Sequence, residues 1–207
     1  MVAFAKQDAV APRYTDAVRA ARAGGFEPVL RLAGGRAAVF HEQTIALAHA
    51  VPDPASRTGI HSRFDRTAQL IARALRRLHV DARVGEVPGE YCPGGYSVNA
   101  REAVKLAGIG QRIIAGGSHL GGVIVVGDAR RIRDVLVPVY EALELAWEPA
   151  TAGAVQDEVD GVTPDPWTAV RDALLAEYGR EYEIVEAELD PETVALAHRL
   201  AAEHRPG

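Results

Sequence analysis

A nearly all-apolar segment, residues 120–126, constrains the fold of this chain more than any other feature. Residues 108–115 before it also read as a strand, and Gly116-Gly117 between the two predicts a hairpin. A strand that is apolar on both faces is typical of the middle of a sheet. The longest purely apolar run, residues 123–126, is far too short to cross a bilayer. We therefore expect a buried sheet and no membrane partner.

Several helices are predicted around this hairpin. Apolar residues recur at steps of three and four over residues 59–79, which predicts an amphipathic helix. Residues 15–23 read as a short helix, and Asp128 opens another helical stretch that contains Pro138. Two Asp-Pro pairs place a capping carboxylate before a proline at the first helical position. These pairs predict helices over residues 166–178 and 191–203.

Further strands alternate with these helices. Residues 27–32 and 37–40 flank a glycine turn and predict a second hairpin. Residues 81–87 read as a strand, residues 181–189 as an edge strand, and residues 52–54 as a loop. This interleaving predicts an α+β fold, a single domain over residues 1–207 with a mixed or antiparallel sheet flanked by helices.

Composition limits the function classes. The net charge of −5 argues against nucleic acid as the main partner. A single cysteine excludes an internal disulfide framework and a cysteine-rich zinc site. Residues 1–12 hold no long apolar segment of the kind found in signal peptides. We therefore expect a reduced, cytoplasmic setting.

The single cysteine, Cys92, lies in the turn sequence Tyr-Cys-Pro-Gly-Gly-Tyr at residues 91–96. A turn can hold a thiol where substrate reaches it, and a nearby cation favours the nucleophilic thiolate. Lys105 follows closely and is the candidate cation, whereas Glu90 would oppose the thiolate unless it points away. This pattern suggests acyl-transfer chemistry. The alternatives are a small buried hydrophobe for Cys92 and an ordinary outward lysine for Lys105.

Other candidate residues give weaker signals. Arg31 and Arg36 flank Gly34-Gly35, and arginines beside glycines suit a carboxylate or phosphate, although glycines in a hairpin usually serve only the turn. The seven histidines show no metal-ligand spacing, so we expect no metal site. P-loop, Rossmann and nucleophile-elbow motifs are missing.

Two segments resemble one known family. Residues 31–41, Arg-Leu-Ala-Gly-Gly-Arg-Ala-Ala-Val-Phe-His, are similar to the glycine-rich segment of lipoate-protein ligases, octanoyltransferases and biotin-protein ligases. Residues 104–112, Val-Lys-Leu-Ala-Gly-Ile-Gly-Gln-Arg, are similar to the lysine segment of the same family. Ala33 departs from the usual Ser or Thr. The cysteine turn ahead of the lysine is most similar to that of cysteine-dependent octanoyl or lipoyl amidotransferases.

The resemblance implies a lipoate/biotin-ligase-like catalytic domain and assigns roles to its residues. It implies Cys92 as the nucleophile and Lys105 as the group that binds and polarises the acyl carbonyl. Gln111 and Arg112 would shape the site from the next strand. The resemblance implies substrate binding by these residues: Arg31, Gly34, Gly35, Arg36, His41, Gly108, Gln111 and Arg112.

The implied function is transfer of an octanoyl or lipoyl group to a lysine of a lipoyl-carrier domain through a Cys92 thioester. The implied partners are glycine-cleavage H-type proteins or dehydrogenase E2-type subunits, and transfer needs no cofactor. The first alternative is an ATP- and Mg²⁺-dependent lipoate-protein ligase that forms an acyl-adenylate, with Cys92 incidental. The second is a non-catalytic protein that holds a lipoate-type ligand.

Overall fold

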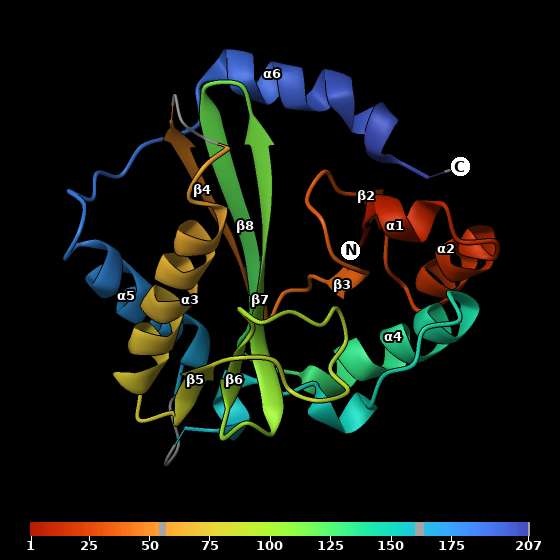
Figure 1. Ribbon diagram of the computed structural model, residues 1–207, viewed down its shortest axis with the longest axis horizontal. Helices are drawn as coiled ribbons and strands as arrows, with labels where there is room; N and C mark the ends of the chain where they lie inside the picture. The colour runs from red at the N-terminus through yellow and green to blue at the C-terminus, as the bar shows by residue number, and fades with distance from the viewer. Residues whose placement is uncertain (54–56, 160–163, 207) are drawn as a thin grey trace.

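The protein, described by a computed structural model over residues 1–53, 57–159 and 164–206, is built on two β-sheets (Figure 1). The larger sheet is antiparallel, with strand order β4-β8-β7-β6-β5. The smaller sheet has the order β2-β1-β3 and is mixed. The α+β prediction with a mixed or antiparallel sheet and flanking helices is confirmed.

The predicted central hairpin is confirmed. β7 (Val104–Ile114) and β8 (Gly117–Val125) pair along most of their length, and Gly116 in the connection has φ +79°. β8 pairs with β4 (Thr44–Pro52) on its other side, so it is interior, as its apolar sequence predicted. β7 begins four residues before the predicted strand and therefore includes Lys105. β6 (Val98–Ala100) and β5 (Ala82–Val84) complete the sheet.

The predicted hairpin of residues 27–32 and 37–40 is wrong. β2 (Pro28–Leu30) and β3 (Ala38–Val39) both pair with β1 (Val2–Phe4), which lies between them. β1 runs parallel to β2 because a helical connection returns the chain in the same direction. The segment between β2 and β3 must cross over β1, so it forms an open loop instead of a tight turn.

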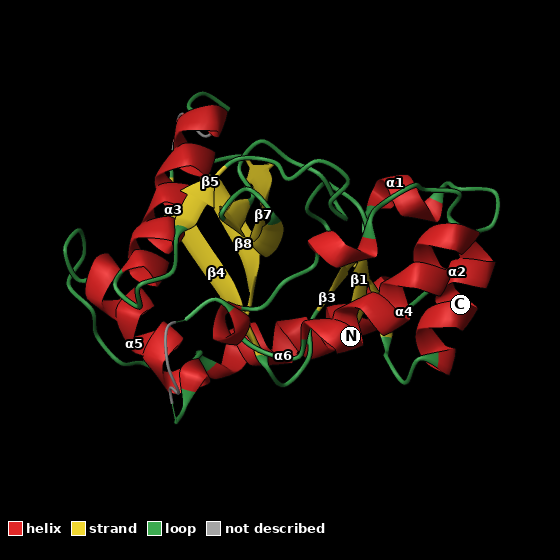
Figure 2. Cartoon of the chain, turned by 90° about the horizontal axis from the view of Figure 1, so that it is seen from below, coloured by secondary structure: helices red, strands yellow, loops and turns green. Residues whose placement is uncertain are grey.

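Helices cover the two sheets separately (Figure 2). α3 (Ile60–Arg76) and α5 (Pro166–Tyr178) pack together against the larger sheet. α2 (Tyr14–Ala23) and α4 (Ala129–Ala142) pack together against the smaller sheet. Shorter elements are α1 (Lys6–Ala9) and the 3-10 helices Pro149–Thr151, Val155–Asp157 and Ala201–His204. None of the described helices is long and apolar enough to cross a membrane.

The helix caps predicted at Asp165 and Asp190 are confirmed, and Asp128 forms a third. The side chains of Asp128, Asp165 and Asp190 each accept a hydrogen bond from a backbone N–H in the first turn of α4, α5 and α6 (Pro191–Leu200). α4 continues through Pro138. α6 spans the top of the molecule in Figure 1, and His204 beyond it contacts the Leu30 carbonyl oxygen at 2.6 Å.

Two segments differ from the sequence expectation. Residues 181–189 form an exposed connection to α6 and contain no strand. β4 was not predicted, because alanine at every second position weakens the strand signal although its burial does alternate. Within the predicted loop of residues 52–54, Pro52 is the last residue of β4 and the Asp53 N–H donates to the Gly116 carbonyl oxygen. Pro54 lies outside the described residues.

We expect stability to depend on the α3 face that packs on the larger sheet. Leu75 is fully buried there, and Leu75→Ala should lower the free energy of unfolding by about 2–5 kcal/mol. Leu175 on α5 is 46% exposed, so the same substitution there should cost only about 0.5 kcal/mol. Urea denaturation of the two variants checks this, and equal losses would contradict the packing described.

Candidate functional site

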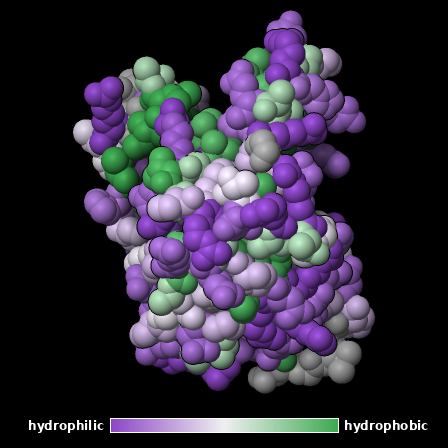
Figure 3. All heavy atoms as spheres, turned by 90° about the vertical axis from the view of Figure 1, so that its right-hand side faces the viewer, coloured by the Kyte–Doolittle hydropathy of each residue, from purple (hydrophilic) through white to green (hydrophobic). Residues whose placement is uncertain are grey.

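A cavity of about 1460 Å³ is lined by residues of both sheets, α3 and the loops between them. Apolar side chains such as Leu47, Phe64 and Ile109 form much of its wall. Figure 3 shows one face of the molecule notched at its top, where hydrophobic side chains reach the surface. Most of the residues that the sequence singled out line the cavity: Arg31, Gly34, Gly35, Cys92, Lys105, Gly108, Gln111 and Arg112.

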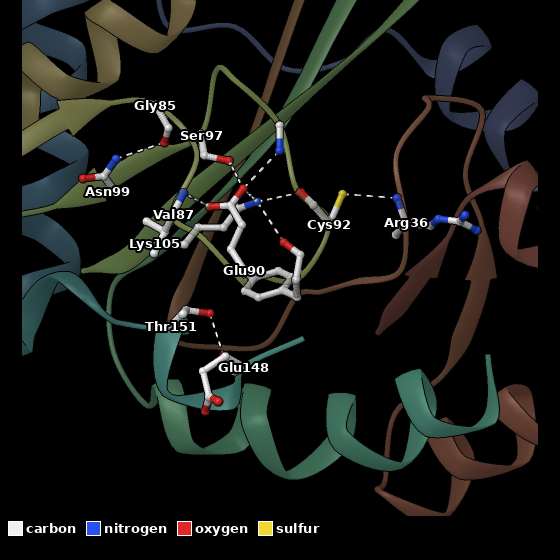
Figure 4. Close-up of polar contacts among 12 residues, drawn as sticks. Arg36, Gly85, Val87, Glu90, Cys92, Ser97, Asn99, Lys105, Glu148 and Thr151 are labelled. Atoms are coloured by element: carbon white, nitrogen blue, oxygen red, sulfur yellow. Dashed lines mark hydrogen bonds and ion pairs between the residues drawn. The ribbon is translucent and has the colours of Figure 1, made fainter. Parts of the chain in front are cut away.

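Cys92 is half-buried at the junction of the two sheets, and its sulfur accepts two hydrogen bonds, of which Figure 4 shows the one from Arg36. The backbone N–H of Arg36 lies 3.2 Å from Sγ, and Nη2 of Arg31 lies 3.6 Å from it. Both donors belong to the open loop between β2 and β3. Cys92 itself has φ +45°, a left-handed conformation that is uncommon for a residue other than glycine. The loop that carries Cys92 therefore holds its thiol against the other sheet.

Gly35 allows this close approach. Its φ is +95°, and a Cβ added there would lie 2.8 Å from Sγ of Cys92 and 2.9 Å from Nη2 of Arg31. Arg31 Nη2 also donates to the Arg36 carbonyl oxygen at 2.8 Å, which closes the loop on itself. The resemblance assigns both glycines to substrate binding, and at Gly35 the space left by the missing side chain is taken up by the thiol.

Tyr140 of α4 connects the two loops at the thiol. Its hydroxyl accepts a hydrogen bond from the Cys92 N–H at 2.8 Å and donates one to the Ala37 carbonyl oxygen at 3.0 Å. Burial raises the pKa of Tyr140 well above its ordinary value, so the phenol keeps the proton that it donates. Sequence reasoning missed this residue, because nothing near Tyr140 in the chain marks it as a neighbour of Cys92.

Among the described contacts, no hydrogen bond joins the Lys105 ammonium to the sulfur. This ammonium is 2% exposed and donates to Glu90 Oε1 at 3.0 Å, to the Tyr91 carbonyl oxygen at 3.0 Å and to the Cys92 carbonyl oxygen at 2.8 Å. Three ammonium hydrogens are thus matched by three oxygens. The buried Glu90 carboxylate is thus the ion-pair partner of this lysine, and the expectation that Lys105 favours the thiolate stays a prediction.

Glu90 organises the loop that carries Cys92. Its Oε1 also accepts hydrogen bonds from Ser97 Oγ at 2.5 Å and from the Gly94 N–H at 3.1 Å, and its Oε2 accepts one from the Val87 N–H at 3.2 Å. Figure 4 shows these bonds converging on one carboxylate. Glu90 therefore points at Lys105, away from the thiol, and folds residues 87–97 around itself.

Three of the remaining residues lie along β7. Gln111 and Arg112 are on the same strand as Lys105, not on the next one. Both polar atoms of the Gln111 side-chain amide are buried and have no hydrogen-bond partner in the described structure. Gly108 lies beside Lys105, where a Cβ would be 3.2 Å from its Cε. β7 thus presents small residues and one unpaired amide to the cavity.

Two predicted residues lie outside the large cavity. The Arg36 guanidinium points to the buried carboxylate of Asp8 at 3.4 Å, although its backbone contacts the thiol. His41 lines a smaller cavity of about 380 Å³ with Met1 and Arg131, and burial lowers its pKa. Within the described residues, no group of three or more His, Cys, Asp or Glu side chains could hold a metal ion.

Comparison with known proteins identifies the class. The family model of the lipoyl protein ligase A/B catalytic domain matches residues 7–175, and the chain belongs to this family. An octanoyl-[GcvH]:protein N-octanoyltransferase of Exiguobacterium sibiricum is 31% identical over 142 residues, which are 69% of this chain and 51% of that protein. The enzyme of the same name from Anoxybacillus flavithermus is 38% identical over 95 residues, 45% of this chain and 33% of that protein. The chain thus spans about half, or less, of the length of these relatives.

Solved structures show the same fold. A lipoate-protein ligase A bound with ATP superposes with a TM-score of 0.69 at 18% identity, covering 98% of this chain and 77% of that one. A bi-partite lipoate protein ligase from Thermoplasma acidophilum gives a TM-score of 0.68 at 18% identity, covering 98% and 76%. At this identity the likeness concerns the fold alone.

Replacing Gly35 should disturb the contact between the two loops. Gly35→Ala places a methyl group against Sγ at a positive φ, and we expect it to cost about 1–3 kcal/mol. Gly34→Ala is the matched control for stability, because a Cβ there meets nothing within 4 Å. Thermal unfolding measures both. A Gly35→Ala variant as stable as the Gly34→Ala variant would contradict the described approach of the thiol.

The buried pair of Glu90 and Lys105 should be strongly coupled. Glu90→Gln leaves the ammonium without its carboxylate, and we expect a loss of about 3–5 kcal/mol. Lys105→Met should cost a similar amount, and the double variant should lose clearly less than the sum. Chemical denaturation of the three variants and the parent completes the cycle. Additive losses would show that the two charges do not interact.

Proposed function

We propose that this chain is a catalytic domain that transfers an octanoyl or lipoyl group to a lysine of a lipoyl-carrier protein through a thioester on Cys92. One observation carries the proposal. The single thiol of the chain is held by two donors at the wall of a largely apolar cavity that can take an acyl chain. Residues 1–207 would act together, because the cavity draws its walls from both sheets.

The related enzymes support the direction of transfer. Their shared name describes an octanoyl donor, GcvH, and a protein acceptor. We infer a carrier of the glycine-cleavage H type as the donor and a dehydrogenase E2-type lipoyl domain as an acceptor. The proposed enzyme acts in the cytoplasm and requires no ATP, because the acyl group is already bound to its donor.

The chemistry proceeds in two steps. The Cys92 sulfur forms a bond to the acyl carbonyl carbon while the bond from that carbon to the donor lysine nitrogen breaks, and the thiol proton ends on the leaving amine. The acceptor lysine amine then attacks the thioester, the new amide forms, and the proton from the attacking amine returns to the sulfur. One difficult exchange between two proteins is thus divided into two displacements at one sulfur.

Lys105 would act on the acyl carbonyl during these steps. It is one of the residues that line the cavity, and its ammonium donates to the Cys92 carbonyl oxygen at 2.8 Å. A bound acyl group would replace one of the two loop carbonyls as an acceptor, and the missing Cβ of Gly108 leaves space beside the lysine. The positive charge would then stabilise the oxyanion that develops in each displacement.

A ligase bound with ATP has the same fold, so an ATP-dependent ligase is the first alternative to test. A ligase would activate a free acid with ATP and Mg²⁺ and would not need a thiol. A non-catalytic binding protein would modify no acceptor under either condition.

We expect an octanoylated H-type carrier alone to give an octanoyl adduct on the protein. Intact-protein mass spectrometry detects the adduct, and lability to hydroxylamine identifies a thioester. Cys92 is the only cysteine, so Cys92→Ala should abolish both the adduct and the transfer while the fold survives. Acceptor modification that requires ATP and persists in Cys92→Ala would instead indicate a ligase. Ligand binding without modification under any condition would indicate a binding protein.

A further inference from the structure

We propose that Arg31 stabilises the Cys92 thiolate through the charged hydrogen bond that it donates to the sulfur. The inference rests on the proposed function only in that the thiolate is the attacking species. The proposal gives Arg31 and Lys105 different roles in the site. Arg31 acts on the sulfur, while Lys105 holds the loop and faces the acyl carbonyl.

The position of the Arg31 guanidinium carries the proposal. Its Nη2 lies 3.6 Å from Sγ and is fixed by a second bond, 2.8 Å long, to the Arg36 carbonyl oxygen. On the other side, Nη1 lies against β7, where it would be 3.7 Å from a Cβ at Gly110. The guanidinium is thus held between its own loop and the central hairpin, with one N–H group directed at the sulfur.

The two other cationic residues that hydrogen-bond to Cys92, Lys105 and Arg36, already have ion-pair partners. The Lys105 ammonium forms an ion pair with Glu90 and also donates to two carbonyl oxygens. The Arg36 guanidinium is paired with Asp8. Among the ion pairs of the described residues, none includes Arg31. Its charge is therefore not neutralised by a direct carboxylate partner, and its stabilising effect on an anion at Sγ is retained.

The sulfur has the donors that an anion requires. The Arg36 N–H lies 3.2 Å from Sγ, so one neutral and one charged donor point at the same atom. A thiolate accepts such bonds more strongly than a thiol does. The same two donors serve both displacements, because the sulfur must be an anion when it attacks and when it leaves.

Titratable side chains around the thiol include Asp8, Arg31, Arg36, Glu90, Tyr91, Lys105 and Tyr140, and Arg112 on β7 lines the same cavity. Burial raises the pKa of Tyr140 well above its ordinary range. The two carboxylates are held in ion pairs with Arg36 and Lys105. Substituting Arg31 therefore changes the one charged side chain that donates to the sulfur.

Alkylation of the single cysteine by iodoacetamide tests the proposal without acyl transfer. At pH 7, Arg31→Met should be alkylated about tenfold more slowly than the parent, and Arg31→Lys should lie between the two. The difference should close at pH 10, because an ordinary cysteine thiol is ionised there without a cationic neighbour. Arg130→Met is the charge-matched control, because Arg130 on α4 is 83% exposed and pairs only with Asp134 among the described residues. Its alkylation rate should equal that of the parent.

Two outcomes would overturn the proposal. In one, Arg31→Met reacts as fast as the parent at pH 7. In the other, it is slowed by the same factor at every pH, which means that the substitution only changes access to the sulfur. Either result leaves the thioester assay of the proposed function unaffected, so the two hypotheses fail separately. Arg31→Lys keeps the charge and provides the second variant if Arg31→Met does not fold.

Discussion

The buried ion pair of Glu90 and Lys105 is the interaction on which the site depends. Removing two charges from water costs several kcal/mol per ion, and only good geometry with further hydrogen bonds offsets that cost. Here the carboxylate accepts from Ser97, Gly94 and Val87 as well as from the ammonium, and the ammonium donates to two backbone carbonyls. The pair thereby fixes both ends of the cysteine loop to the strand beneath it, which a purely apolar contact could not do with the same directionality.

From this pair, a series of restraints leads to the sulfur. Lys105 holds the Cys92 carbonyl, and Tyr140 holds its N–H, so the peptide groups on both sides of this left-handed residue are fixed. Tyr140 also holds Ala37, at the end of the loop from the other sheet. The two sheets have separate hydrophobic clusters, so the thiol lies where their loops meet. At this junction the thiol lies beside a cavity, while both hydrophobic clusters stay buried.

Sequence patterns predicted the elements whose signals are local. The central hairpin, α3 and two aspartate caps follow from periodicity and turn chemistry within about twenty residues. Pairings that join distant segments were missed or wrong. β1 separates β2 from β3, and nothing in the glycine turn reveals this insertion. Cys92 was found from its turn, but Tyr140 lies 48 residues away on another layer, and only the folded structure brings them together.

The same limit explains why the sequence pointed to Lys105, and not to Arg31, as the charged neighbour of the thiol. Lys105 is 13 residues from Cys92 and Arg31 is 61 residues away, so proximity in the chain favours the lysine. Charge alone does not decide the effect, because a cation that is already paired with a buried carboxylate has little net field to offer a second anion. The lysine is neutralised by Glu90, whereas Arg31 arrives from the opposite sheet with a free N–H for the sulfur. A fold that joins two sheets at one cysteine can therefore place one positive charge in the scaffold and another at the reacting atom.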